Sequence, residues 1–290
     1  MKWEDAYMSS GARQIQLGRK LREIRNAVGL SLDGVAARLE RSRATVGHWE
    51  SGYSRISAQD LEGLFRLYDT SEEMQDQLRQ LRRDSHKRGW WQSYKLPDYI
   101  NPFLGFEYEA AEIFHFELGV VPGLLQTEEY AKAVHEAGRL ELSDDELQGW
   151  VEARIQRQKR LESGGGLTLH AVIAEEALYR IVGSCDIMAR QLEYLEEVSK
   201  RASVKLRILP YKNGAHVGMH GPIMVLRSSD PSHSDVAFSD TPLGGHIIDD
   251  PRDVSELSRL YSALESQALP LASSSKQLRN IAREHISSKE

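Results

Sequence analysis

The chain of 290 residues has one cysteine, Cys185, and no long run of apolar residues. A single cysteine excludes an internal disulfide framework and a metal site built from several cysteines. No stretch approaches the roughly 18 consecutive apolar residues that a membrane span requires. The opening residues, MKWEDAYMSS, carry acids where a secretory signal has basic residues, and no apolar segment follows them. Together these absences predict a cytoplasmic location.

The overall composition is that of an ordinary globular protein. Apolar residues make up 40% of the chain and charged residues 28%, so a core of useful size is expected. At roughly 150 residues per domain, the length predicts about two domains.

Charge is distributed unevenly along the chain. Residues 1–88 carry 16 Lys and Arg against 13 Asp and Glu, whereas residues 89–290 carry 21 against 30. A basic N-terminal part ahead of an acidic remainder favours a polyanionic partner for that part alone. The alternative is that a difference of this size is ordinary variation in charge.

The first 86 residues predict an all-α domain of five short helices. Apolar residues recur at helical spacing from Arg13 to Val28, and Gly29 follows where a glycine commonly ends a helix. A serine, whose hydroxyl can accept a backbone N–H at a helix start, precedes each of the next four helices. These serines are Ser31, Ser42, Ser57 and Ser71.

Residues 87–290 predict an α+β domain. Trp90 and Trp91 are expected to dock a connector, and residues 106–118 fit either a helix or a strand. Strands are predicted at 167–173, 204–210, 222–226 and 235–238. Helices are predicted at 127–137, 143–161, 185–203, 251–267 and 273–286, with a loop at 163–166. The chain is therefore expected to be mainly α with a smaller β component, and its two domains to span 1–86 and 87–290.

Two short helices joined by a tight turn form the most informative motif. The first runs over residues 32–39, and the second runs from Ser42 to about residue 51. Such a pair can lay its second helix in the major groove of DNA. Val46 and Trp49 are three residues apart and are expected to face the core. The opposite face then presents Arg43, Ala44, Gly47 and His48.

Residues 13–69 resemble the Cro/C1-type helix-turn-helix domain of phage repressors and xenobiotic-response-type bacterial regulators. The resemblance rests on Leu21, Arg25, Gly29, Leu30, Ser31, Val35, Ala36, Ser42, Thr45, Val46, Trp49, Glu50, Gly52 and Leu61. It implies an ion pair between Arg25 and Glu50 that ties the first helix to the recognition helix. A helical bundle that only scaffolds a partner is the structural alternative.

The same resemblance implies how the domain contacts double-stranded DNA. Arg43, Ala44 and His48 would contact bases, with Leu32 at the start of the preceding helix. Ser42, Arg55 and backbone N–H groups would contact phosphates. The expected DNA-binding residues are Leu32, Ser42, Arg43, Ala44, Thr45, Gly47, His48 and Arg55.

Residues 90–280 resemble the C-terminal domain of the WhiJ-type antitoxin-like developmental regulators of filamentous bacteria. The resemblance rests above all on VPGLLQTEEYA at 121–131. Proteins of this type are often encoded beside a small partner protein, so the resemblance implies such a partner. Pro122, Gly123, Gln126 and Tyr130 form either a partner or ligand surface, or a turn supported by core leucines.

The remaining clusters predict no catalytic residue, no cofactor and no metal. His216 and His220 have no third ligand at suitable spacing. Cys185 opens a helix beside apolar residues, which is typical of a core cysteine rather than a nucleophile.

These observations predict a cytoplasmic, sequence-specific DNA-binding transcription regulator. One recognition helix reads only a few base pairs, so a homodimer held by the C-terminal domain is expected, together with partner or effector sensing. One alternative is an antitoxin-like protein that mainly sequesters a small partner protein. A second is an enzyme with an attached DNA-binding domain, which the missing catalytic residues disfavour.

Overall fold

Two compact units make up the chain in the computed structural model. The first is Met1–Gln92 with Asp98–Tyr108, and the second is Ser93–Pro97 with Glu109–Glu290. The described residues are 10–85, 89–94, 96–138, 143–162, 164–229, 234–241 and 244–287. The domain boundary predicted between residues 86 and 87 lies outside them, as does Ser163 of the predicted loop.

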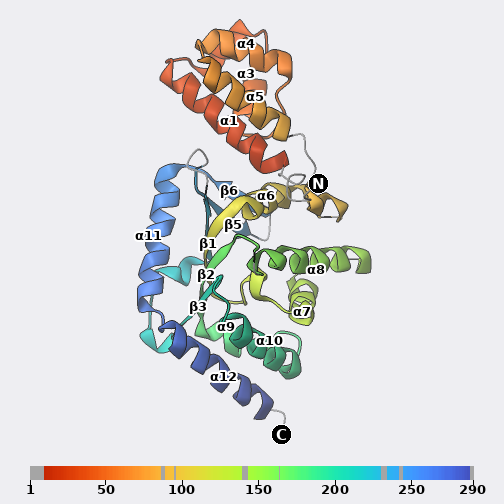
Figure 1. Ribbon diagram of the computed structural model, residues 1–290, viewed down its shortest axis with the longest axis vertical. Coiled ribbons are helices and arrows are strands. Elements are labelled where there is room, and N and C mark those ends of the chain that lie inside the picture. Colours follow the sequence, from red (N-terminus) through yellow and green to blue (C-terminus); the bar gives the residue numbers. More distant parts are fainter. Residues whose placement is uncertain are drawn as a thin grey trace. The chain divides into compact units, whose positions relative to one another are not determined.

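Five helices form the body of the N-terminal unit (Figure 1). They are α1 (Ser10–Ala27), α2 (Leu32–Arg38), α3 (Arg43–Glu50), α4 (Ala58–Tyr68) and α5 (Glu72–Asp84). Their inner faces build one core, which includes Leu17, Leu21, Val35, Val46, Trp49, Leu61, Leu64, Phe65 and Leu78. The predicted all-α domain of five helices is confirmed.

The predicted serine caps fix where four of these helices begin. The Oγ atoms of Ser31, Ser42 and Ser57 each accept a backbone N–H three residues ahead at 3.0 Å. Ser71 does the same at 3.4 Å. Each bond satisfies an amide that has no partner within its own helix, which sets the helix start.

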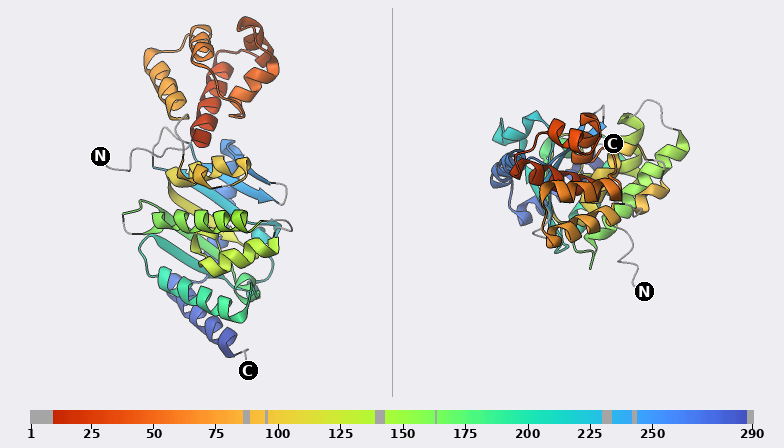
Figure 2. Two further views of the ribbon diagram at one scale, coloured as in Figure 1. Left: turned by 90° about the vertical axis from the view of Figure 1, so that its right-hand side faces the viewer. Right: turned by 90° about the horizontal axis from the view of Figure 1, so that it is seen from above.

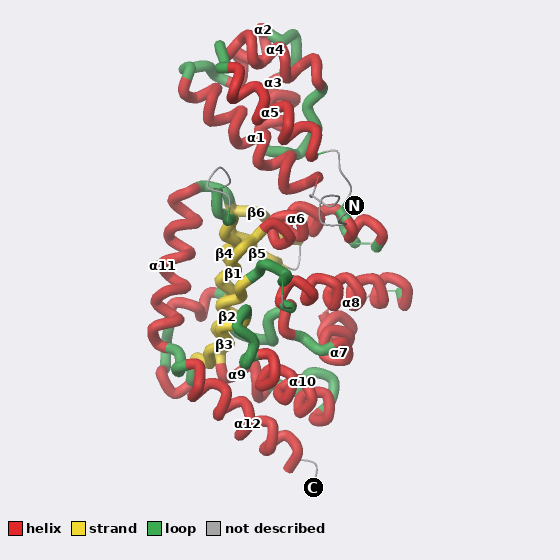
Figure 3. Tube along the Cα trace, viewed as in Figure 1, coloured by secondary structure: helices red, strands yellow, loops and turns green. Residues whose placement is uncertain are grey.

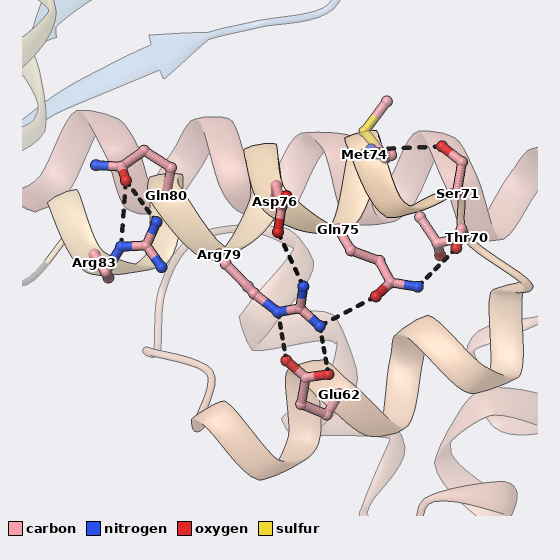
Figure 4. A network of polar contacts seen from close by, with 9 residues as sticks. All are labelled: Glu62, Thr70, Ser71, Met74, Gln75, Asp76, Arg79, Gln80 and Arg83. Atoms are coloured by element: carbon pink, nitrogen blue, oxygen red, sulfur yellow. Dashed lines mark hydrogen bonds and ion pairs between the residues drawn. The ribbon is translucent and has the colours of Figure 1, made fainter.

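Arg79 connects α4 to α5 (Figure 4). Its Nε and Nη2 atoms donate to the two carboxylate oxygens of Glu62 at 2.8 and 2.9 Å. Nη1 donates to Asp76 at 3.1 Å, and the guanidinium lies over the Phe65 ring at 5.1 Å. One side chain thus supports the packing of both helices.

Aromatic residues dock the connector that follows α5. Trp91 is only 1% exposed and meets the Trp90 ring edge-on, with ring centroids 5.6 Å apart. The ring of Tyr108, from α6 (Asn101–Glu109), lies 6.3 Å from that of Trp91. Gly89 fits because a Cβ there would lie 2.4 Å from the Trp91 ring.

A six-stranded mixed sheet organises the C-terminal unit. Its strand order is β3-β2-β1-β4-β5-β6. The strands are β1 (Ala110–Glu117), β2 (Thr168–Ala174), β3 (Val204–Leu209), β4 (Ile223–Ser228), β5 (Val236–Thr241) and β6 (Gly244–Ile248). β1, β2 and β3 are parallel, whereas β4 pairs antiparallel with β1 and is followed by antiparallel β5 and β6.

Helices cover both faces of this sheet (Figures 1 and 3). One face is covered by α11 (Pro251–Gln267), whose Val254, Tyr261 and Leu264 join a core with Phe116 and Val172. The other face, seen in the left view of Figure 2, carries α7 (Glu128–Gly138), α8 (Asp144–Gln158), α9 (Glu175–Tyr179) and α10 (Cys185–Val198). The last helix, α12 (Leu271–Ser287), packs on α10 and β3.

The predicted fold class, mainly α with a smaller β component, is confirmed, and the details differ in three places. Residues 106–118 are helix up to Glu109 and strand from Ala110. The helix predicted at 185–203 ends at Val198, before a turn into β3. Neither α9 nor β6 was predicted, because α9 has five residues and β6 opens with two glycines.

Candidate nucleic-acid interface

Helices α2 and α3 form the helix-turn-helix of the N-terminal unit. The turn between them contains Glu40 in the left-handed region, at φ 53°, and the Arg41 N–H donates to the Ala36 carbonyl at 2.9 Å. Val46 and Trp49, at 1% and 6% exposure, anchor α3 to the core. The side of α3 opposite these two residues faces solvent.

Arg25 and Glu50 connect α1 to the end of α3. Arg25 Nε and Nη2 donate to the two carboxylate oxygens of Glu50 at 2.6 and 2.9 Å. Arg25 Nη1 also donates to the Leu30 carbonyl at 2.8 Å, so one buried guanidinium holds three segments. The hydrogen bond to Glu50 raises the pKa of Arg25. A bidentate pair of this kind fixes the angle of α3 relative to α1.

Gly18 allows α1 to approach the end of α3 closely. A Cβ on Gly18 would lie 2.3 Å from the Trp49 carbonyl oxygen and 2.8 Å from that of Glu50. Gly52, at φ +68°, would likewise bring a Cβ within 2.7 Å of the Ile15 Cα. Sequence reasoning did not identify Gly18, because its partner is 31 residues away and nothing local marks it.

The structure gathers most of the predicted DNA-binding residues on one exposed surface. Arg43, Ala44 and His48 are exposed on α3, and Arg55 is exposed in the loop that follows it. Ser42 Oγ caps α3 and also lies 2.8 Å from Thr45 Oγ1. Gly47 is partly buried, yet apart from its chain neighbours and the backbone of its own helix no atom lies within 4 Å of the position of an added Cβ.

Leu32 differs from the other predicted residues. It is partly buried and packs against the core of the N-terminal unit. Its side chain therefore supports the start of α2 as well as lying near the exposed surface.

Tyr53 adds an aromatic group that sequence reasoning did not identify. It is 79% exposed, and its ring centroid lies 4.8 Å from that of His48. Its place in the loop between Gly52 and Arg55 was the available signal, and that signal is weak because single exposed aromatic side chains are common on protein surfaces.

Acidic side chains engage two arginines at this surface. Arg41 Nε donates to Asp60 at 3.0 Å. Arg43 Nε lies 3.6 Å from an Asp33 carboxylate oxygen, and both of these side chains are about 70% exposed. The first contact is a hydrogen bond from the turn to the start of α4, whereas the second is a loose ion pair between the starts of α2 and α3.

Hydrogen bonds from two glutamines hold the loop that follows β1, where the VPGLLQTEEYA segment of residues 121–131 begins. Gln126 Nε2 donates to the Val121 carbonyl at 2.7 Å, and Arg154 Nη1 donates to Gln126 Oε1 at 2.6 Å. Gln191 accepts from the Thr127 N–H and donates to the Leu125 carbonyl, both at 2.7 Å. Helices α8 and α10 thus fasten this loop from two sides.

The four residues predicted as a partner or ligand surface lie within this loop and the helix after it. Pro122, Gln126 and Tyr130 are buried, and Gly123 is partly exposed. Tyr130 Oη accepts from the Val121 N–H at 3.1 Å, and burial raises the pKa of this tyrosine. Their polar atoms are thus used inside the loop, and the predicted surface stays a prediction.

Three further features of the described residues concern metal ligands, the single cysteine and helix hydrophobicity. Within the described ranges, no group of three or more His, Cys, Asp or Glu is arranged to hold a metal ion. Cys185 is partly buried at the start of α10. No helix in the described part of the chain combines the length and apolar character of a membrane span.

Comparison with known proteins assigns the two parts of the chain to different families. Residues 16–78 match a family described as a helix-turn-helix domain. Residues 100–280 match a family described as a domain of unknown function, DUF5753. No curated protein and no solved structure matches the chain.

Proposed function

Because the chain belongs to the DUF5753 family and carries a helix-turn-helix domain ahead of that domain, we propose that it is a sequence-specific DNA-binding transcription regulator. In this proposal α3 lies in the major groove and the C-terminal unit brings two copies together. The proposal also assigns the C-terminal unit the sensing of an effector or a small partner protein.

The observation that carries the proposal is the division of α3 into two faces. Val46, Trp49 and Glu50 are buried, whereas Arg43, Ala44 and His48 are exposed. The exposed face combines small side chains with one arginine and one histidine, so it can approach base edges without steric conflict. A helix capped by serine also points backbone N–H groups toward a phosphate.

Each exposed residue has a distinct role in this proposal. Arg43 begins α3 and donates to a guanine, while His48, about one and a half turns further on, reaches the same groove. Ala44 and Gly47 leave room for bases, and Leu32 supports the approach of α2. Ser42, Thr45 and Arg55 contact the sugar–phosphate backbone.

Selection of genomic DNA fragments by the full chain, followed by sequencing, tests the proposal and supplies the cognate duplex. Arg43→Ala should weaken binding to that duplex by about 1–3 kcal/mol and relax preference at one base pair. Arg55→Ala should weaken binding to the cognate and scrambled duplexes alike. It should also reduce the slope of log affinity against log salt concentration by about one unit. Unchanged DNA affinity in both variants would favour the alternative of a protein that sequesters a partner.

Two copies of α3 on one site are needed for useful affinity. A single module reads only a few base pairs, and dimers of this class place half-sites about one helical turn apart. Sedimentation should therefore show self-association of residues 89–290 and a monomer for residues 1–86. The reverse distribution would assign dimerisation to the N-terminal unit instead.

A further inference from the structure

Asp33 places a negative charge on the surface that the proposed function presents to DNA. It lies in the first turn of α2, and its side chain is 72% exposed. Its carboxylate Oδ1 lies 3.6 Å from Nε of Arg43, the first residue of α3. An ion pair this exposed contributes little to folding, so the pairing with Arg43 adds little to the stability of the fold.

Among the residues that the structure describes, no hydrogen bond occupies the terminal nitrogens of Arg43. Asp33 faces Nε, whereas a bidentate contact to guanine uses the terminal nitrogens Nη1 and Nη2. Within the described residues, Asp33 is the only partner of the Arg43 side chain. The nearby Arg41 differs because its Nε is held at 3.0 Å by Asp60, whose side chain is only 12% exposed.

We propose that Asp33 is a specificity-determining residue that acts by positioning Arg43. This inference rests on the proposed function. On random DNA a free, flexible arginine would turn to a phosphate and add affinity without information. Asp33 competes with phosphate for that guanidinium and itself repels phosphate. On the cognate site Arg43 contacts its base while Nε still faces Asp33, so the carboxylate penalises random DNA more than cognate DNA.

Asp33→Asn in the full chain tests the proposal, with the cognate duplex from the genomic selection and a scrambled duplex of equal length as probes. The variant should bind the scrambled duplex about fivefold more tightly, the effect of roughly one exposed charge interaction. Binding to the cognate duplex should change less, so the ratio of the two affinities falls. Asp33→Glu keeps the charge and should restore the ratio.

Two further variants separate positioning from simple repulsion. In an Arg43→Ala background, Asp33→Asn should change the affinities for both duplexes by the same factor, because there is no arginine at position 43 for Asp33 to position. Glu23→Gln is the matched control, since Glu23 is also exposed and lies 3.6 Å from an arginine, Arg19, but on α1. It should leave the affinity ratio unchanged.

The outcomes distinguish the inference from the function on which it rests. An equal change on both duplexes for Asp33→Asn, with Arg43 present, would overturn the inference and leave the proposed function standing. An unaltered affinity for both duplexes would do the same. If the wild-type chain bound no duplex, the proposed function and the inference would both be wrong.

Discussion

Arg25 Nε lies 2.6 Å from one carboxylate oxygen of Glu50, and Arg25 Nη2 lies 2.9 Å from the other. Both side chains are buried. The two residues are 25 positions apart in the sequence and join α1 to α3. The pair therefore fixes the orientation of α3 from its buried side, opposite the exposed face that carries Arg43 and His48.

Arg25→Ala should destabilise the fold rather than change which sequence is read. Removing Arg25 leaves the buried Glu50 carboxylate with only the longer ion pair to Arg22, at 3.8 Å, at a cost of up to about 3 kcal/mol. Urea unfolding followed by tryptophan fluorescence, and the ratio of affinities for cognate and scrambled duplexes, would measure the two effects. Equal stability of variant and parent would show that the pair does not hold the fold.

A double substitution gives the control for that experiment. Arg25→Met with Glu50→Met replaces both charges by apolar groups of similar length, so no charge is left buried alone. The double variant should be more stable than either single variant. If the loss of stability in the double variant equalled the sum of the losses in the two single variants, Arg25 and Glu50 would not be energetically coupled.

Gly18→Ala and Gly47→Ala should have opposite effects on stability. Both glycines lie inside helices, but an added Cβ at Gly18 would meet backbone of α3 within 3.0 Å, whereas space is open at Gly47. We expect Gly18→Ala to cost about 1–3 kcal/mol through overpacking, and Gly47→Ala to gain up to about 1 kcal/mol in helix propensity. Urea midpoints of the two variants would test this, and a loss at Gly47 as large as that at Gly18 would contradict it.

Glu62 should make part of the stability of the N-terminal unit depend on pH. Its hydrogen bond from Arg79 holds the pKa of the carboxyl below its ordinary value of 4.5. A carboxyl whose pKa is lowered by folding adds stability above the pKa of the unfolded chain, and that stability is lost as the pH falls through the folded pKa. Glu62→Gln should thus lower the urea midpoint slightly at pH 7, and the difference from the parent should shrink as the pH falls below 4.5 and the Glu62 carboxylate becomes protonated. If the difference between the urea midpoints of Glu62→Gln and the parent did not depend on pH, the ionisation of Glu62 would not be its cause.

Local chemistry predicted most of the N-terminal unit from the sequence. Serine at four helix starts and apolar residues at helical spacing act within a few residues, so these helices were predicted closely. The approach of α1 to α3 at Gly18 depends on residues far apart in the chain, and no short pattern encodes such a distance. The contact between Asp33 and Arg43 could not be predicted for the same reason, because the starts of α2 and α3 meet only once the two helices are packed together.

The C-terminal unit was predicted less completely, and its residues show why. Ala110 and Ala111 favour a helix, yet they begin β1, because pairing with β2 and β4 outweighs their weak local preference. The loop residue Gln126 was expected to be either structural or at a surface. Its 1% exposure and its hydrogen bonds to Val121 and Arg154 come from α8 packing on this loop, which the sequence does not reveal.

Gln191→Met should loosen the loop after β1 without emptying space in the core. Gln191 is fully buried on α10 and forms hydrogen bonds with Leu125 and Thr127, more than 60 residues earlier. Methionine has a similar volume but leaves the Leu125 carbonyl and the Thr127 N–H buried without partners, at a cost of about 2 kcal/mol. Hydrogen exchange measured by mass spectrometry should show lost protection in residues 121–130. Gln148→Met is the matched control, because Gln148 is exposed on α8 and donates to Glu152 on the same helix. Equal protection of residues 121–130 in the two variants would show that Gln191 does not fasten the loop.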